Sequence, residues 1–280
     1  MSDARSNSRS PWPALLLTCT ALLGGCASLP GASTVEVDGR RVEAIVARHP
    51  GPTVVFEHGL GGTLDGWADV WPAVAKDSAA LAYNRAGYGR SDAAPQPRSG
   101  EQVVAELRAL LKAQRMTPPY VLVGHSLGGL YMQLYARQFP EEVRALILVD
   151  STHPEQFRGN GDPSHWPAWV RVGFNMLSSD VVKQEFGQLD ATGQRVLGLP
   201  PPAGVPVWVL SALRPMQERS ELADDANEKR VALASLYPGA RQVWVDSGHV
   251  IPLEKPEAVV AAIREALGAA PVAPAAQIGR

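Results

Sequence analysis

Short apolar runs alternate with longer segments of helical periodicity along most of the chain. Several of the runs are continuously apolar, as expected of strands that are buried on both faces. The segment 101–115 has an apolar stripe at helical spacing, and Pro256 opens a second such helix that ends near Gly268. This alternation predicts an α/β fold with a mostly parallel central sheet flanked by helices. The predicted strands cover residues 42–47, 53–56, 80–83, 120–123, 145–149, 205–210 and 241–245.

Residues 153–204 interrupt this rhythm. They are rich in Gly, Pro, Trp and Asn, with helical patterns only at 165–177 and 180–190. An insertion of this kind after the strand 145–149 predicts a small cap over the sheet. The expected organisation is therefore a core in two parts, 34–152 and 205–267, with the cap at 153–204 between them. Residues 268–280 have too little apolar bulk to pack and are predicted to be disordered.

The N-terminal residues 1–25 have the pattern of a signal peptide. Arg5 and Arg9 precede an apolar run, Ala14–Leu23, that is too short to cross a hydrocarbon core of about 30 Å. The run ends in Leu-Gly-Gly-Cys26, which resembles a bacterial lipobox. The resemblance implies a lipid on Cys26, a short tether over 26–33 and an outer-membrane lipoprotein that meets the membrane surface through its anchor. The alternative is a plain secretory signal and a secreted or periplasmic product.

Composition excludes several other classes. A hydrophobic content of 45% over 280 residues is enough for a well-buried core. The net charge of −2 argues against a nucleic-acid partner. Two cysteines, Cys19 and Cys26, can form neither a disulfide framework nor a cysteine-rich metal site. The six histidines have no i, i+4 spacing, so no metal or other cofactor is expected.

The strongest chemical signal is Gly124-His125-Ser126-Leu127-Gly128, directly after the strand 120–123 and at the start of a helical segment. A serine in such a sharp turn is presented in a strained, exposed conformation, and the flanking glycines keep side chains out of the bend. The helix start also places backbone N–H groups beside it. A chance glycine-rich turn is the alternative, and the strand–turn–helix context disfavours it.

Two further motifs accompany this turn: His58-Gly59-Leu60-Gly61-Gly62, and the segment 84–91 with the sequence NRAGYGRS. With them, residues 40–267 resemble the α/β-hydrolase superfamily, which implies the α/β-hydrolase fold. The resemblance implies an oxyanion hole made by the main-chain N–H groups of Leu60 and Leu127, and a loop-shaping role for His58. Asn84 departs from the Asp that the family usually has there.

A serine hydroxyl needs a neighbouring base before it becomes a good nucleophile. His249 follows the last predicted strand and precedes the proline-initiated helix, which is where the family carries its base. The remaining candidates fit less well: His58 belongs to the loop, His125 to the serine turn, and the others lie in a turn or in the cap, namely His49, His153 and His165.

The acid of the triad is harder to place. The family usually has it after the strand 205–210, where this chain has no carboxylate before Glu218. Some members use the end of the preceding strand, and there we predict Asp150. Its role would be to orient the imidazole and stabilise its cation. Asp246 is interpreted as a turn residue, and the open alternatives are Glu218, Glu221, Asp224 and Asp225.

Together these features predict a serine hydrolase that cleaves a small-molecule ester or acyl substrate through an acyl-enzyme, in the manner of a carboxylesterase or lipase. The alternatives are a C–C bond hydrolase, a thioesterase, a peptidase or a non-catalytic ligand-binding relative. Glu57 and Arg85 are expected to pair beneath the active-site loops. The apolar residues of the cap are expected to line an entrance or else to bury the cap: Trp166, Trp169, Phe174, Met176 and Leu177.

Overall fold

The computed structural model describes residues 29–214, 216 and 220–268. The predicted signal peptide, Cys26, Glu218 and residues 269–280 of the predicted tail lie outside these ranges. The interpretation of those segments therefore stays a prediction. None of the helices in the described ranges is long and apolar enough to span a bilayer.

One eight-stranded sheet forms the centre of the described chain, with the order β1-β2-β4-β3-β5-β6-β7-β8. Strands β1 and β2 are antiparallel, as are β2 and β4, whereas every pair from β4 to β8 is parallel. The mostly parallel sheet that the sequence predicted is thus confirmed. The strands are β1 Ser33–Val37, β2 Arg40–Ala47, β3 Val54–Glu57, β4 Ala80–Tyr83, β5 Tyr120–His125, β6 Val143–Val149, β7 Val207–Ala212 and β8 Arg241–Val245.

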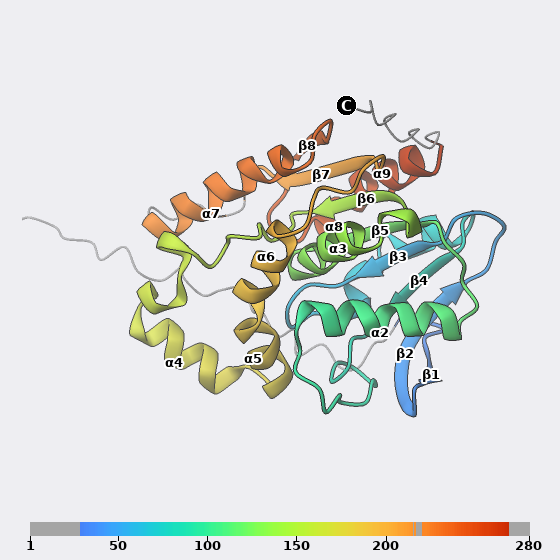
Figure 1. The fold of residues 1–280 in the computed structure, drawn as a ribbon, viewed down its shortest axis with the longest axis horizontal. Coiled ribbons are helices and arrows are strands. Elements are labelled where there is room, and N and C mark those ends of the chain that lie inside the picture. Colours follow the sequence, from blue (N-terminus) through green and yellow to red (C-terminus); the bar gives the residue numbers. More distant parts are fainter. Residues whose placement is uncertain (1–28, 215, 217–219, 269–280) are drawn as a thin grey trace, which may run out of the picture.

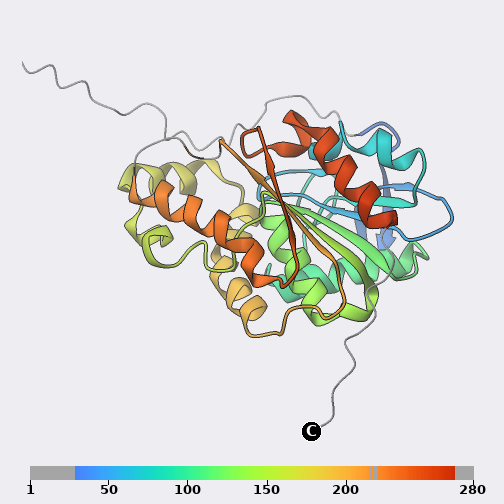
Figure 2. The same cartoon turned by 90° about the horizontal axis from the view of Figure 1, so that it is seen from above.

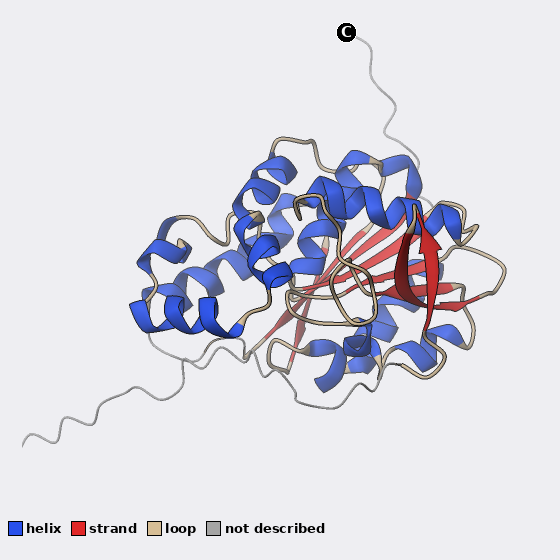
Figure 3. Ribbon diagram, turned by 90° about the horizontal axis from the view of Figure 1, so that it is seen from below, coloured by secondary structure: helices blue, strands red, loops and turns tan. Residues whose placement is uncertain are grey.

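Helices cover both faces of the sheet (Figure 3). Alternate residues of one strand point to opposite faces, and in β5 both sets are apolar. Leu122 packs in the cluster formed with α2 and α3, while Val121 and Val123 pack in the cluster formed with α1 and α9. This explains why the central strands are continuously apolar in sequence. The covering helices are α1 Trp71–Ala75, α2 Gly100–Ala113, α3 Leu127–Gln138, α8 Ile251–Glu254 and α9 Pro256–Gly268.

The cap follows β6, as predicted. Its helices are α4 Ala168–Leu177, α5 Asp180–Gly187 and α6 Leu189–Leu197. Another helix, α7 Glu221–Ala232, lies between β7 and β8. Figures 1 and 2 show α4, α5 and α7 gathered beyond one end of the sheet. The sequence ELADDANEKRVA of α7 has hardly any apolar stripe, which is why helical periodicity did not predict it.

The N-terminal part of the fold differs from the prediction. Ser33 begins β1, and Leu29 is buried in the core with its N–H donating to the Asp65 carboxylate over 2.6 Å. The predicted tether over 26–33 is therefore wrong for its described part. Asp38 and Gly39 form the turn between β1 and β2, both with positive φ (49° and 74°). An Asp-Gly pair is a strong hairpin signal. The hairpin was not predicted because the strand before this pair is mostly exposed and lacks a continuous apolar run.

Candidate active site

Ser126 stands between the end of β5 and the first residue of α3. Its backbone has φ 54° and ψ −123°, an unfavourable region for a residue with a side chain. The surrounding chain holds it there: its N–H donates to the Val149 carbonyl (3.1 Å), and its own carbonyl accepts from Thr152 N–H (3.0 Å). A Cβ on Gly128 would lie 2.3 Å from the Glu57 carbonyl oxygen, so only glycine fits the start of the helix. The turn is thus strained and rigidly supported.

Asp150 and His249, which are far apart in the sequence, form a side-chain hydrogen bond. Asp150 directly follows β6, and His249 lies in the loop between β8 and α8. Nδ1 of His249 donates to Oδ2 of Asp150 over 2.6 Å. A carboxylate only accepts hydrogen bonds, so the proton of a neutral ring sits on Nδ1 and Nε2 keeps a free lone pair. The Asp150 side chain is fully buried, while 42% of the His249 side chain is exposed.

The Asp150 carboxylate has two further partners. Oδ1 accepts from the Ala212 N–H (3.0 Å) and from Nε of Arg230 (2.7 Å), and Oδ2 accepts from Nη2 of Arg230 (3.2 Å). Burial by itself would raise the pKa of Asp150, but the bonds and charges of His249 and Arg230 outweigh burial and hold this pKa below its usual value. Asp150 is therefore a carboxylate. The sequence carried no motif that pointed to Arg230.

The other acid candidates have different partners or positions. Asp225 pairs with Lys229 (2.7 Å), and Asp246 pairs with Arg214 (3.0 Å). Glu221 and Asp224 lie in the first turn of α7, and Glu218 is outside the described residues. Strand β7 runs to Ala212, two residues further than predicted, and its last N–H binds Asp150. The end of β7 thus supplies a donor to Asp150, the predicted acid, rather than a carboxylate of its own.

His125 connects the serine turn to the His249 loop. Its Nε2 donates to the main-chain oxygen of His249 over 2.9 Å, and the two imidazole rings are 4.9 Å apart. Burial and the neighbouring His249 lower the pKa of His125 to about 4, so its ring is neutral near pH 7. The residue before Ser126 therefore fixes the main chain of the predicted base.

The loop after β3 lies against Ser126. A Cβ on Gly59 would be 3.1 Å from Cβ of Ser126, and Leu60 is the next residue. Leu127 is in the first turn of α3, where backbone N–H groups have no partner within the helix. The two predicted oxyanion residues thus lie in segments that border the serine. His58 uses both ring nitrogens inside the loop, with Nδ1 donating to Gly59 O (2.9 Å) and Nε2 accepting from Arg85 N–H (3.4 Å).

A buried ionic group, here called the Arg85 cluster, lies beneath this loop and consists of Glu57, Tyr83, Arg85, Tyr88 and Glu185. The predicted pairing of Glu57 with Arg85 is confirmed, with Nη1–Oε1 at 2.6 Å. Arg85 also donates to Glu185 of α5 through Nε (2.7 Å) and Nη2 (2.8 Å). The same guanidinium donates to the carbonyls of His58 (2.6 Å) and Gly59 (3.1 Å). Arg85 therefore joins the loop after β3, which carries the predicted oxyanion residue Leu60, to the cap.

Asn84 has a physical reason to replace the usual Asp. Its Oδ1 accepts from Leu64 N–H (2.7 Å), and its Nδ2 donates to the buried Glu43 carboxylate (2.8 Å). An aspartate could make only the first bond and would set two carboxylates against each other. The amide therefore suits this position in this chain.

A sequence profile of the family described as "alpha/beta hydrolase fold" matches residues 52–196. The chain belongs to the α/β-hydrolase family. It is 24% identical over 276 residues to the uncharacterized protein YbdG of Bacillus subtilis, covering 83% of this chain and 85% of that one. It is 31% identical over 134 residues to the mouse (lyso)-N-acylphosphatidylethanolamine lipase, covering 44% of this chain and 37% of that protein. The crystal structure of a putative lipase from Acinetobacter baumannii has a similar fold (TM-score 0.60, 19% identity, 84% of this chain, 89% of the other).

The remaining histidines of this hydrolase, His49, His153 and His165, form hydrogen bonds with groups other than Asp150. Nε2 of His49 bonds with the Ala75 carbonyl at the surface, and Nδ1 of His165 with Gly159 O. His153 is buried, which lowers its pKa, and its Nδ1 accepts from Glu155 N–H. Across the described ranges of the hydrolase, no three His, Cys, Asp or Glu side chains gather in a way that could hold a metal ion.

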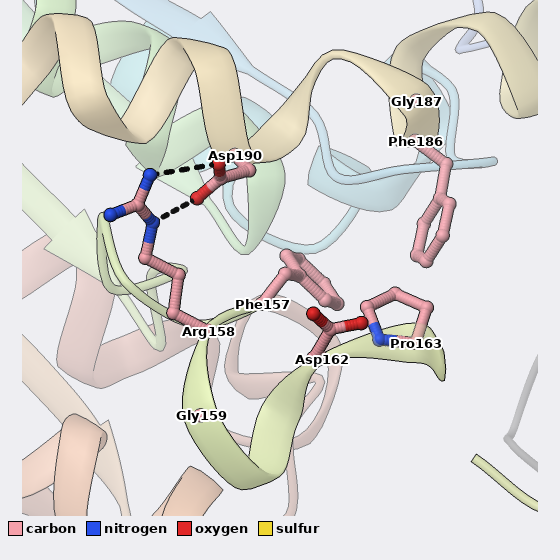
Figure 4. Close-up of a pocket in the computed structure, with 8 residues that line it drawn as sticks. All are labelled: Phe157, Arg158, Gly159, Asp162, Pro163, Phe186, Gly187 and Asp190. Carbon is pink, nitrogen blue, oxygen red and sulfur yellow. Dashed lines mark hydrogen bonds and ion pairs between the residues drawn. The ribbon is translucent and has the colours of Figure 1, made fainter. Parts of the chain in front are cut away.

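The cap of the hydrolase contains a pocket of about 600 Å³ (Figure 4). Phe157 and Phe186 line it, and Arg158 and Asp190 pair at its rim. Trp166 and Phe174 pack on Phe186, with ring centroids 5.5 Å and 4.6 Å away, so they bury the cap as one alternative expected. The other three apolar residues behave differently and are exposed to solvent: Trp169, Met176 and Leu177.

Proposed function

We propose that this hydrolase cleaves an ester of a small molecule through a covalent acyl-enzyme. Ser126 is the nucleophile, His249 the general base and Asp150 the acid that orients the imidazole. The observation that carries the proposal is the 2.6 Å bond from His249 Nδ1 to a buried carboxylate. This bond leaves Nε2 as the proton acceptor, on a ring that substrate and water can reach.

In the acylation step, His249 Nε2 takes the proton of Ser126 Oγ as that oxygen attacks the ester carbonyl. The imidazolium that forms is stabilised by the Asp150 carboxylate. The main-chain N–H groups of Leu60 and Leu127 donate to the oxyanion, and one such donor contributes about 10²–10³ in kcat. His249 then protonates the leaving alcohol.

Deacylation repeats these steps with water. The neutral His249 removes a proton from a water molecule, which attacks the acyl carbonyl. As the second oxyanion collapses, the imidazolium returns this proton to Ser126 Oγ, and the carboxylic acid is released. His125 and Arg85 hold the main chain on either side of the reacting oxygen during both steps, through their bonds to His249 O and to the carbonyls of His58 and Gly59.

We propose an apolar acyl or aromatic group for the substrate. Phe157 and Phe186 supply two aromatic rings to a cap pocket that the charged side chains of Arg158, Asp162 and Asp190 also line, and aromatic walls favour ligands with some apolar surface. The names of the mouse and Acinetobacter relatives, both lipases, also favour an ester. A thioester, a peptide or a C–C bond next to a carbonyl would use the same nucleophile, so these substrates are the alternatives for the assay.

The decisive experiment is covalent labelling with a fluorophosphonate, followed by a chain-length series of p-nitrophenyl esters. We expect wild-type protein to take up one equivalent at Ser126 and to hydrolyse at least one ester. Ser126→Ala should take up none, and its kcat should fall by about six orders of magnitude if the triad acts as a unit. Ser164→Ala, at an exposed serine of the cap, is the matched control and should behave as wild type. Labelling of Ser126→Ala at the wild-type rate would contradict the proposal.

A further inference from the structure

We propose that Arg230 is a positioning residue for the triad: it clamps the Asp150 carboxylate and lowers the pH above which His249 acts as a base. This inference rests on the proposed function, because it concerns the same site. Arg230 comes from α7, which lies beside the cap and was not predicted from the sequence.

The contacts describe a clamp on both carboxylate oxygens. Arg230 binds Oδ1 through Nε (2.7 Å) and Oδ2 through Nη2 (3.2 Å). Ala212 N–H adds a second bond to Oδ1, and His249 Nδ1 adds a second bond to Oδ2. A rotation of the carboxylate would break several of these bonds at once. Asp150 can therefore present Oδ2 to the imidazole in only one orientation.

Arg230 is itself held in place. Its Nη1 donates to Asn227 Oδ1 (3.0 Å) one turn earlier in α7, and only 15% of its side chain is exposed. The preceding residue, Lys229, points elsewhere and donates to Asp225 (2.7 Å) and to the Arg158 carbonyl of the cap (2.6 Å). Two consecutive residues of α7 thus hold the cap and the triad acid respectively.

The charge of Arg230 favours the neutral form of the His249 imidazole over the protonated form. Without an arginine, a buried carboxylate would stabilise the imidazolium with its full negative charge. Here the guanidinium neutralises much of that charge, so a protonated His249 would belong to a group with net charge +1 rather than zero. The neutral imidazole, which is the form that accepts the serine proton, is favoured as a result. Bidentate geometry makes arginine better suited to this role than lysine.

The other groups that face His249 do not depend on Arg230. His125 is neutral and lies beneath the ring on the β5 side. Glu254 of α8 accepts from Gly248 N–H (2.8 Å). Arg214, after β7, pairs with Asp246, in the loop before His249 (3.0 Å). A change at Arg230 therefore alters one charge next to Asp150 and leaves these neighbours in place.

The test is the rate of fluorophosphonate labelling of the full chain as a function of pH, from 5 to 9. In Arg230→Met and Arg230→Gln we expect the pH of half-maximal rate to rise by about half a unit to one unit, because a neighbouring positive charge is lost. Arg230→Lys keeps the positive charge but cannot bind both carboxylate oxygens as arginine does. The pH of half-maximal rate should therefore stay near the wild-type value, while the maximal rate falls. Arg195→Met is the control, since Arg195 pairs with Glu101 (3.4 Å) on the exposed side of α6.

Each result decides the question. If either neutral variant is folded, as judged by circular dichroism, and has the wild-type midpoint, Arg230 does not tune His249 and the inference is overturned. A merely structural role would lower the rate in all three variants without moving the midpoint, which also overturns it. If wild-type protein is not labelled at all, the proposed function fails first, so the two failures are distinguishable.

Discussion

Two buried groups of charged side chains lie at the carboxyl end of the sheet, and they differ in how far solvent reaches into them. In the Arg85 cluster, Glu57, Arg85 and Glu185 are each at most 1% exposed. The second group, here called the Asp150 group, consists of Asp150, Arg230 and His249. Its carboxylate is equally buried, but the side chain of Arg230 is 15% exposed and that of His249 is 42% exposed. Both groups combine arginine with carboxylate, so residue type alone does not separate their roles.

The difference in exposure suits the two groups to different roles. The guanidinium of Arg85 binds the carboxylates of Glu57 and Glu185 and the carbonyl of His58. The cluster therefore fixes the loop after β3 and the cap relative to each other. The Asp150 group ends in an imidazole with one free nitrogen at the surface. Proton transfer to a substrate requires such an open end, and a closed cluster provides only position.

The pKa values of the two carboxylates shift in opposite directions although both carboxylates are buried. Burial raises the pKa of Glu57 by more than Arg85 and the Tyr83 hydroxyl lower it, and the neighbouring Glu185 carboxylate raises it a little further. Asp150 is also buried, but the bonds and charges of His249 and Arg230 outweigh burial, so its pKa is lowered. The balance between burial and the neighbouring charges decides the direction.

The largest effect on activity is expected in the Asp150 group. In Asp150→Asn, the amide can donate to Nδ1 and so favours the wrong tautomer of His249, which should lower kcat/KM for an ester by about 10⁴-fold. Asp246→Asn is the matched control: it removes an exposed carboxylate three residues from His249 and should change kcat/KM by less than about threefold. Retention of more than a tenth of the activity in Asp150→Asn would remove the distinction between the groups.

Substitutions in the Arg85 cluster should lower the stability of the fold more than substitutions in exposed ion pairs. Arg85→Met leaves Glu57 and Glu185 buried without their cation and should lower the free energy of unfolding by about 3–5 kcal/mol. Urea denaturation followed by tryptophan fluorescence measures this change. Arg195→Met, which breaks an exposed ion pair, should cost less than about 1 kcal/mol. Glu57→Gln should cost less than Arg85→Met because it removes one of two competing carboxylates. Equal losses in Arg85→Met and Arg195→Met would show that burial of the cluster contributes nothing.

Much of the central fold could be predicted from the sequence because buried parallel strands are continuously apolar. Strand β4 is fully buried and has the predicted bounds. The mostly exposed edge strand β8 has them too, and the serine turn lies at the predicted position. The elements that were missed lack that signal: β1 is short and exposed, and α7 is polar on all sides. Their positions depend on tertiary contacts that no local pattern records.

The site shows the same limit. Motifs predicted the segments that carry Ser126 and Leu60, and the resemblance to the family predicted His249 after the last strand and Asp150 after the strand before it. Arg230 and Glu185 could not be predicted, because each is an ordinary helical residue whose partner lies far away in sequence, 80 and 100 residues respectively. Buried ion pairs between distant segments are a property of the folded chain and leave no spacing to detect.

The smallest effect is expected in the loop after β3, which the Arg85 cluster holds beside Ser126. Leu60→Ala keeps the main-chain N–H, and the loop is still held by the bonds from Arg85 to the His58 and Gly59 carbonyls. Because the donor is in the backbone, kcat should fall by less than about threefold, compared with about 10²–10³ for the loss of a donor itself. Steady-state kinetics with the preferred p-nitrophenyl ester measures this. A loss above a hundredfold would mean that the Leu60 side chain, rather than the Arg85 cluster, sets the position of the loop.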